Sequence, residues 1–154
     1  MNKTFRETQG FNKLIIGLLI AFVFGGTIYG YYHSNQLENG DMTQSYWATG
    51  ISLLVAIWLL SVRLRTEIDH EGIHMKFRPF ANKHLAWSDI ESIEVVNYGF
   101  VGGWGVRLFT KYGTVYNTKG QWGIAIVPKE GKKFLIGTQR PEEVKMIIQH
   151  YLSR

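Results

Sequence analysis

Three histidines stand beside two carboxylates in a segment that alternates like a β-hairpin. His70 and His74 flank the dipeptide Glu71-Gly72, Asp69 precedes them, and His84 follows on the next strand or loop. Imidazole and carboxylate groups are common zinc ligands, so cross-strand histidines with Asp69 or Glu71 could hold an ion. Exposed polar residues of a hairpin explain the pattern more simply. We therefore predict no metal site and no cofactor.

Arg107 is the second candidate for chemistry. It lies in an expected strand that follows glycines at positions 99, 102, 103 and 105. An arginine fork suits a small anion or a carboxylate, so one alternative function is a membrane-tethered ligand sensor that uses Arg107. The glycines do not form a nucleotide-binding fingerprint, because a strand and not a helix follows them. With no cysteine and no G-x-S-x-G motif, we predict a non-enzymatic protein.

A cluster of cations is the third candidate. Lys129, Lys132 and Lys133 surround an expected turn, and Arg63 and Arg65 follow an apolar run. Near anionic lipid headgroups each such cation contributes about 1 kcal/mol. These five residues are our predicted headgroup contacts, although charged turns are usually only solvated. The formal net charge of +5 is modest and no RNA-binding motif is present, so we predict no nucleic-acid partner.

Two apolar runs must position these residues. Residues 14–32 and 46–62 carry no charge, and the segment 33–45 joins them. At about 1.5 Å per residue, a helix over either run nearly crosses a hydrocarbon core of about 30 Å. The sequence therefore predicts a transmembrane hairpin over 14–62, a leader over 1–13, and a domain over 63–154. A cleaved signal peptide is the alternative, but the run is long and no A-x-A-like site follows it.

Flanking charges give the expected orientation. Lys3, Arg6 and Lys13 precede the first run, Arg63 and Arg65 follow the second, and 33–45 contains no Lys or Arg. The positive-inside rule places both termini in the cytoplasm and the loop outside. We expect a multi-pass protein of the inner (plasma) membrane, integral to the lipid bilayer.

Small residues recur every four positions in both runs. Gly26 and Gly30 have this spacing in the first, as do Ala48, Ser52 and Ala56 in the second. Such stripes let helix backbones approach closely. They indicate packing within the hairpin or, alternatively, a surface for homo-oligomers.

From Thr66 onward the pattern is short alternating runs separated by turn residues, which is typical of an all-β fold. A capping box at Ser88–Glu91 predicts one helical turn, and Pro79–Lys83 is expected to be a loop. Seven strands are predicted, over 66–70, 73–78, 90–97, 104–110, 114–117, 122–127 and 132–136.

The last segment predicts an amphipathic helix. Pro141 suits a first helical position, and Glu142 and Glu143 complement the helix dipole. An apolar stripe follows at helical spacing, formed by Val144, Ile147, Ile148, Tyr151 and Leu152. This stripe must be covered, and the open end of a strand barrel is the expected partner.

Seven strands and a final helix resemble the pleckstrin-homology (PH) architecture. The residues that carry the resemblance are Trp87–Ile90, Gly103–Arg107 and Gly131–Thr138, followed by Pro141-Glu142. The chain resembles bacterial PH-like membrane proteins, in which transmembrane segments precede a small barrel. The resemblance implies an α+β fold: a transmembrane helical hairpin followed by a seven-stranded PH-like β-barrel capped by a C-terminal α-helix.

Phosphoinositide binding is not carried over from that resemblance. The first hairpin turns on Glu71-Gly72, which is short and acidic, although Lys76 and Arg78 follow with lysine-x-arginine spacing. We expect a non-enzymatic, membrane-anchored interaction module. Its predicted partner is a membrane protein, anionic lipid or a second copy of the chain.

Overall fold

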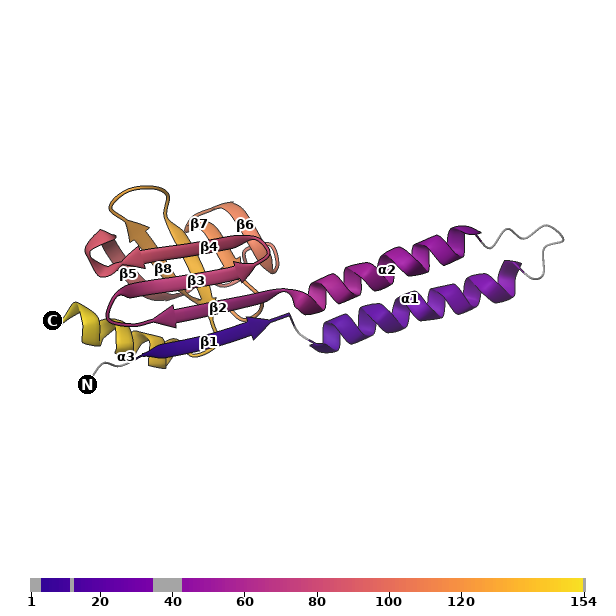
Figure 1. Ribbon diagram of the computed structural model, residues 1–154, viewed down its shortest axis with the longest axis horizontal. Helices are drawn as coiled ribbons and strands as arrows, with labels where there is room; N and C mark the ends of the chain where they lie inside the picture. Colours follow the sequence, from indigo (N-terminus) through magenta and orange to yellow (C-terminus); the bar gives the residue numbers. More distant parts are fainter. Residues whose placement is uncertain (1–3, 12, 35–42, 154) are drawn as a thin grey trace. The chain divides into compact units, whose positions relative to one another are not determined.

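A computed structural model describes residues 4–11, 13–34 and 43–153 of the chain (Figure 1). The chain divides into two compact units. One is a helical unit, Phe11–Val62, and the other is a β unit made of Met1–Gly10 and Arg63–Arg154. Residues 5–10, which the sequence places in a polar leader, are therefore part of the β unit.

The helical unit consists of two antiparallel helices, α1 (Lys13–Ser34) and α2 (Thr43–Ser61). They contact each other along their length, and the hydroxyl groups of Thr27 and Thr49 lie 2.7 Å apart. Small residues do not bring the backbones together everywhere, because a side chain added at Gly26 would meet no neighbour within 4 Å. The predicted outside loop 33–45 lies for the most part beyond the described residues.

The prediction of two transmembrane helices is wrong. Within the described ranges, no helix combines the length and the apolar content that a crossing of the hydrocarbon core requires. The predicted multi-pass inner-membrane location with cytoplasmic termini depended on those spans and is corrected with them.

The first sheet of the β unit has four antiparallel strands in the order of the chain. They are β1 (Phe5–Gly10), β2 (Arg63–Ile68), β3 (Gly72–Arg78) and β4 (Ala81–Ala86). Gly10, the last residue of β1, pairs with Arg63, the first residue of β2. In the sequence, the helical unit therefore lies between two strands that are neighbours in one sheet. An Asx turn at Asp69, whose carboxylate accepts the amides of Glu71 and Gly72, joins β2 to β3.

The second sheet has five strands in the order β5-β8-β9-β7-β6. The strands are β5 (Ile90–Asn97), β6 (Gly105–Thr110), β7 (Gly113–Asn117), β8 (Trp122–Pro128) and β9 (Phe134–Thr138). A short 3₁₀ turn, η1 (Trp87–Asp89), carries the chain from β4 in one sheet to β5 in the other. β7 and β9 are parallel, and the other neighbouring strands are antiparallel.

The main core lies between the two sheets. Phe5, Leu64 and Phe77 are buried on the inner face of the first sheet, and Ile124 and Ile136 are buried in the second. Aromatic rings connect the two layers, since Phe77 packs edge-on against Tyr116 at 6.3 Å and Tyr116 against Phe134 at 6.4 Å. These contacts hold the two sheets as layers of one unit.

The C-terminal helix α3 (Pro141–Leu152) contacts β1 and β5, an edge strand of each sheet. The predicted helix is confirmed, with Val144, Ile147 and Ile148 buried beneath it. Tyr151 stacks on Trp87, with ring centroids 5.2 Å apart. Leu152, by contrast, is exposed, so the packed stripe ends at Tyr151, one residue earlier than predicted.

The α+β class is confirmed, but the seven-stranded barrel is wrong. Two open sheets of four and five strands take its place. Two strands were not predicted: β1 lies in the supposed leader, and β4 covers part of the supposed loop Pro79–Lys83. The described strands form no ladder between β4 and β5, because η1 separates them.

Candidate functional site

The outer face of the four-stranded sheet is strongly basic. Alternation along each strand sends apolar side chains into the core and leaves every second residue outside. The outward residues include five cations and one carboxylate. We call this surface the basic face and define it by Arg6, Arg63, Arg65, Lys76, Arg78 and Glu67.

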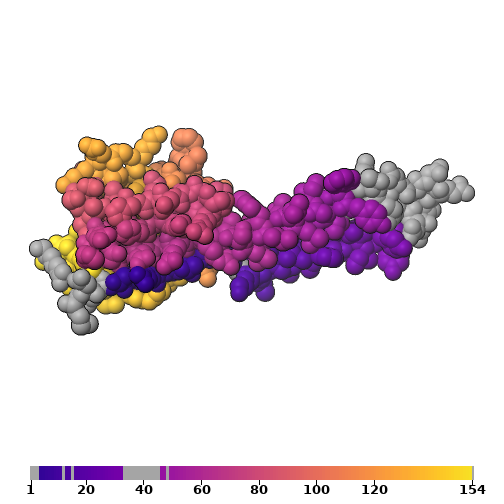
Figure 2. All heavy atoms as spheres, viewed as in Figure 1, coloured from indigo at the N-terminus to yellow at the C-terminus, as the bar shows by residue number. Residues whose placement is uncertain are grey.

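Strand register groups these side chains in rows across the sheet. Arg63 pairs with Arg78, and Arg65 with Lys76. Residues directly opposite on antiparallel strands point to the same side, so two rows of like charge lie next to each other. Figure 2 shows the surface formed by β1–β4, in indigo to rose.

Glu67 neutralises only part of this charge. Its carboxylate bonds to Arg6 Nε at 2.5 Å and lies 3.8 Å from Arg65 Nη2. Among the described residues, neither Lys76 nor Arg78 has an acidic partner within ion-pair distance. Like charges that are held side by side without a counter-charge favour the binding of an external anion.

The structure separates the predicted headgroup residues into different places. Arg63 and Arg65 lie on the basic face. Lys132 lines a hollow of about 310 Å³ with Asn82 and Lys83 of β4, whereas Lys133 lines another, of about 420 Å³, with Lys111. Lys129 is at the end of β8, where its amide bonds to the carbonyl of Asp89 beyond β4. The three lysines thus do not form one surface with the two arginines.

Arg107 lies on β6, the last strand at one edge of the second sheet. Its Nη2 donates to the carbonyl of Trp104 at 2.8 Å, while its Nε is buried and has no hydrogen-bond partner among the described residues. A buried N–H without a partner is costly, so this group is suited to donate a hydrogen bond to an anionic ligand.

The glycine-rich loop beside Arg107 is fixed by a buried amide. Asn117 is 1% exposed, accepts the amide of Gly105 at 3.0 Å, and donates to the hydroxyl of Tyr98 at 3.1 Å. Burial raises the pKa of Tyr98, and the hydrogen bond from Asn117 opposes this only in part. Beyond the loop, Phe109 has a φ of 59° and is 99% exposed, at an irregularity in the β6–β7 pairing.

The structure also separates the three histidines that the sequence groups together, at positions 70, 74 and 84. His74 and His84 pair across β3 and β4, and their Nδ1 atoms are 2.8 Å apart. His70 lies at the hairpin turn, where its Nε2 is 3.9 Å from the carboxylate of Glu71. Within the described part of the chain, no three His, Cys, Asp or Glu side chains converge as metal ligands.

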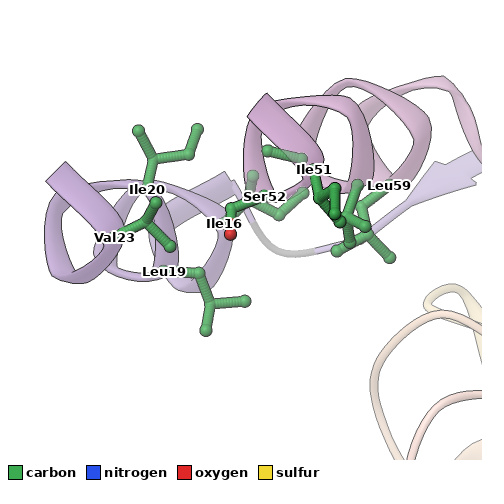
Figure 3. A pocket seen from close by; sticks show the side chains of 9 residues that line it. Ile16, Leu19, Ile20, Val23, Ile51, Ser52 and Leu59 are labelled. Atoms are coloured by element: carbon green, nitrogen blue, oxygen red, sulfur yellow. The ribbon is translucent and has the colours of Figure 1, made fainter. Parts of the chain in front are cut away.

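Apolar side chains are exposed along both helices of the helical unit, and Phe22, Trp47 and Leu54 are each at least two-thirds exposed. A groove of about 190 Å³ runs between the helices (Figure 3). Its lining is apolar except for Ser52 and comprises Ile16, Leu19, Ile20, Val23, Ile51, Ser52, Val55, Ala56 and Leu59. Exposed apolar area of this extent is typical of a contact surface.

Sequence reasoning missed a group of buried hydrogen bonds that holds β1 in place. We call it the polar seam, and it is formed by Glu7 and Gln9 with residues 137–139. Glu7 is 7% exposed, and its carboxylate accepts the hydroxyl of Thr138 at 2.7 Å and the amide of Gln139 at 2.9 Å. Gln9 is 4% exposed and donates to the carbonyl of Gly137 at 2.8 Å. The seam links the edge strand β1 to the end of β9 and thereby supports the basic face.

Comparison with known proteins adds no relative. No protein-family model matches the sequence, and no curated protein is significantly similar to it. The resemblance to bacterial PH-like membrane proteins is therefore corrected, because the family is unmatched, the predicted barrel is two open sheets, and the described residues contain no membrane-spanning helix.

Proposed function

We propose that this chain is a non-enzymatic interaction module whose β unit binds the headgroups of anionic phospholipids through the basic face. The observation that carries the proposal is the pairing of Arg63 with Arg78 and of Arg65 with Lys76, with Glu67 as the one carboxylate on that face. Lys76 and Arg78 have no acidic partner among the described residues, so a neutral surface would leave their charges uncompensated.

The shape and composition of the face favour a lipid surface over a nucleic acid. Four strands about 4.8 Å apart present a broad surface, which suits many headgroups at once. The outward positions of β1–β4 include no Phe, Tyr or Trp, whereas proteins that bind single-stranded nucleic acids stack bases on such rings. Lipid recognition of this kind requires only charge at the right density.

The expected strength follows from the charges. At about 1 kcal/mol for each cation near an anionic surface, five cations and one opposing carboxylate give about 4 kcal/mol. That free energy is roughly a thousandfold preference for anionic over neutral vesicles at low salt. Screening by salt should remove most of it, because the side chains are exposed.

Vesicle flotation of the full chain tests the proposal. Vesicles of phosphatidylcholine alone are compared with vesicles that also contain phosphatidylserine, across a salt series. One variant replaces Arg65, Lys76 and Arg78 by glutamine, and a matched control replaces Lys129, Lys132 and Lys133. Both variants remove three charges and leave the helical unit unchanged. Any contact between the helical unit and the vesicles is therefore the same in both variants.

We expect the preference for anionic vesicles to be lost in the Arg65/Lys76/Arg78 variant and kept in the control. Loss in the control alone would return the binding site to the β8–β9 turn. A preference that neither variant changes would refute electrostatic headgroup binding by these surfaces. That the protein is not an enzyme, and that the hairpin self-associates, stay predictions.

A second candidate function is a sensor of small anions at Arg107. The supporting observation is the Nε of that side chain, which is buried next to Gly103 and has no hydrogen-bond partner among the described residues. A carboxylate or phosphate oxygen would supply the missing acceptor, and the fork geometry of guanidinium would fix its orientation.

Titration with inorganic phosphate, followed by NMR chemical shifts, tests this second candidate. Saturable shifts at residues 99–107 that Arg107→Lys abolishes would support it, since lysine keeps the charge but loses the fork. Equal shifts in Arg107→Lys and the parent chain would mean that only net charge is sensed.

A further inference from the structure

His74 and His84 form a pair on β3 and on its neighbour β4, which is an edge strand of the first sheet. They are register partners across β3 and β4, and their Nδ1 atoms are 2.8 Å apart. The ring centroids are 4.1 Å apart and the rings are tilted by 41°, so the rings lie beside each other and not end to end. Both side chains reach solvent, since the side chain of His74 is 37% exposed and His84 is exposed as well.

Asp69 orients the nearer ring of this pair. Its carboxylate oxygen lies 3.7 Å from Nε2 of His74 and is itself held by the backbone amides of Glu71 and Gly72. A carboxylate at Nε2 favours the tautomer that carries its proton there, which leaves a lone pair on Nδ1. A carboxylate behind a histidine whose other nitrogen carries a lone pair is the usual support of a metal ligand.

We propose that the Nδ1 atoms of His74 and His84 chelate a divalent transition metal ion of the Cu²⁺ or Ni²⁺ type. At imidazole–metal bonds of about 2.0 Å, two ligands at a right angle are about 2.8 Å apart. The Nδ1 atoms are already that close in the free pair, where a hydrogen bond joins them, so small side-chain movements can bring both to one ion. Two imidazole nitrogens with water in the remaining positions suit a tetragonal ion.

Binding requires one internal proton movement. In the free pair one imidazole donates Nδ1–H to the other, and the carboxylate of Asp69 near Nε2 of His74 favours His84 as the donor. When the metal enters, the proton on Nδ1 of His84 passes through solvent to its Nε2, and both Nδ1 lone pairs are then available. Water completes the coordination, because the described residues offer no third converging ligand.

The test is a metal titration of the untagged full chain in a buffer that does not chelate. CuCl₂ is added, and electron paramagnetic resonance and calorimetry follow binding. We expect one Cu²⁺ per chain, with superhyperfine splitting from two imidazole nitrogens. His74→Gln and His84→Gln should each abolish this signal, whereas the control His70→Gln, at the same hairpin, should leave it unchanged.

Asp69→Asn tests the supporting carboxylate and should lower the affinity about tenfold without changing the number of nitrogen ligands. Thermal melting checks that each variant is folded. If His74→Gln is unstable, His84→Gln still tests the proposal, because His84 lies on the edge strand β4. Binding that survives in His84→Gln, or that His70→Gln weakens equally, would overturn the proposal. So would a signal from a single nitrogen.

Discussion

The insertion of the helical unit between paired strands leads to our most specific prediction. Gly10 and Arg63 are register partners at the ends of β1 and β2, so the two strands need only a hairpin turn between them. We expect a chain in which Asn-Gly replaces residues 11–62 to fold as the β unit, because that dipeptide forms the two-residue turn that antiparallel strands prefer. A chain that starts at Arg63 should not fold stably.

The difference between these two chains is β1, and its contribution can be estimated. Phe5 is 1% exposed, and loss of a buried phenylalanine costs about 3–5 kcal/mol. Without β1, Thr138, Gln139 and Gly137 also lose hydrogen-bond partners, at about 1 kcal/mol each. The sum, about 6 kcal/mol or more, is comparable with the whole stability of a small domain.

Urea unfolding followed by circular dichroism measures both chains. The Asn-Gly chain should give one cooperative transition, and the chain from Arg63 should show none, or a midpoint close to zero urea. Phe5→Ala in the Asn-Gly chain is an intermediate case and should lower the free energy of unfolding by about 3–5 kcal/mol. Equal stability of the chains with and without β1 would refute the assigned role of this strand.

Three further predictions concern single residues of the β unit. Ile147→Asp should lower the free energy of unfolding by about 3 kcal/mol or more, because it buries an unpaired charge under α3; an unchanged urea midpoint would mean that α3 is not docked. Stability should fall as the pH rises above about 10, because the unfolded chain ionises Tyr98 at its ordinary pKa while burial raises the pKa of Tyr98 in the folded state. Tyr98→Phe should reduce this alkaline loss, and urea titrations at several pH values would show whether it does. Phe109→Asn should raise the free energy of unfolding by about 0.5–1 kcal/mol, since asparagine tolerates the positive φ and the phenyl ring buries almost nothing; a lower melting temperature would contradict this.

Local patterns in the sequence were sufficient where one face of an element is apolar. The stripe at Val144, Ile147 and Ile148 predicted α3, and the alternation around Ile93 predicted β5. β1 was missed because two of its three inward side chains, Glu7 and Gln9, are polar and are buried against partners that include Thr118 and the end of β9. Such partners are 109 or more residues away, so no local window contains them.

The basic face was only partly predictable for a similar reason. The spacing of Lys76 and Arg78, two residues apart on one strand, indicates that both point the same way. Their position beside Arg63 and Arg65 depends on the register of β2 with β3, which the sequence indicates only through its turn. Lys132 and Lys133, although adjacent in the turn before β9, line different hollows, and strand alternation could not predict this because neither residue lies in a strand.

The most direct test of the central claim maps the contact with lipid residue by residue. The chain with Asn-Gly in place of residues 11–62 is labelled with ¹⁵N and titrated with a short-chain phosphatidylserine, and with the matching phosphatidylcholine as control. We predict saturable amide shifts at Arg65, Lys76 and Arg78 that salt reverses and phosphatidylcholine does not produce. Shifts confined to residues 129–133, or equal shifts with both lipids, would contradict headgroup binding by the basic face.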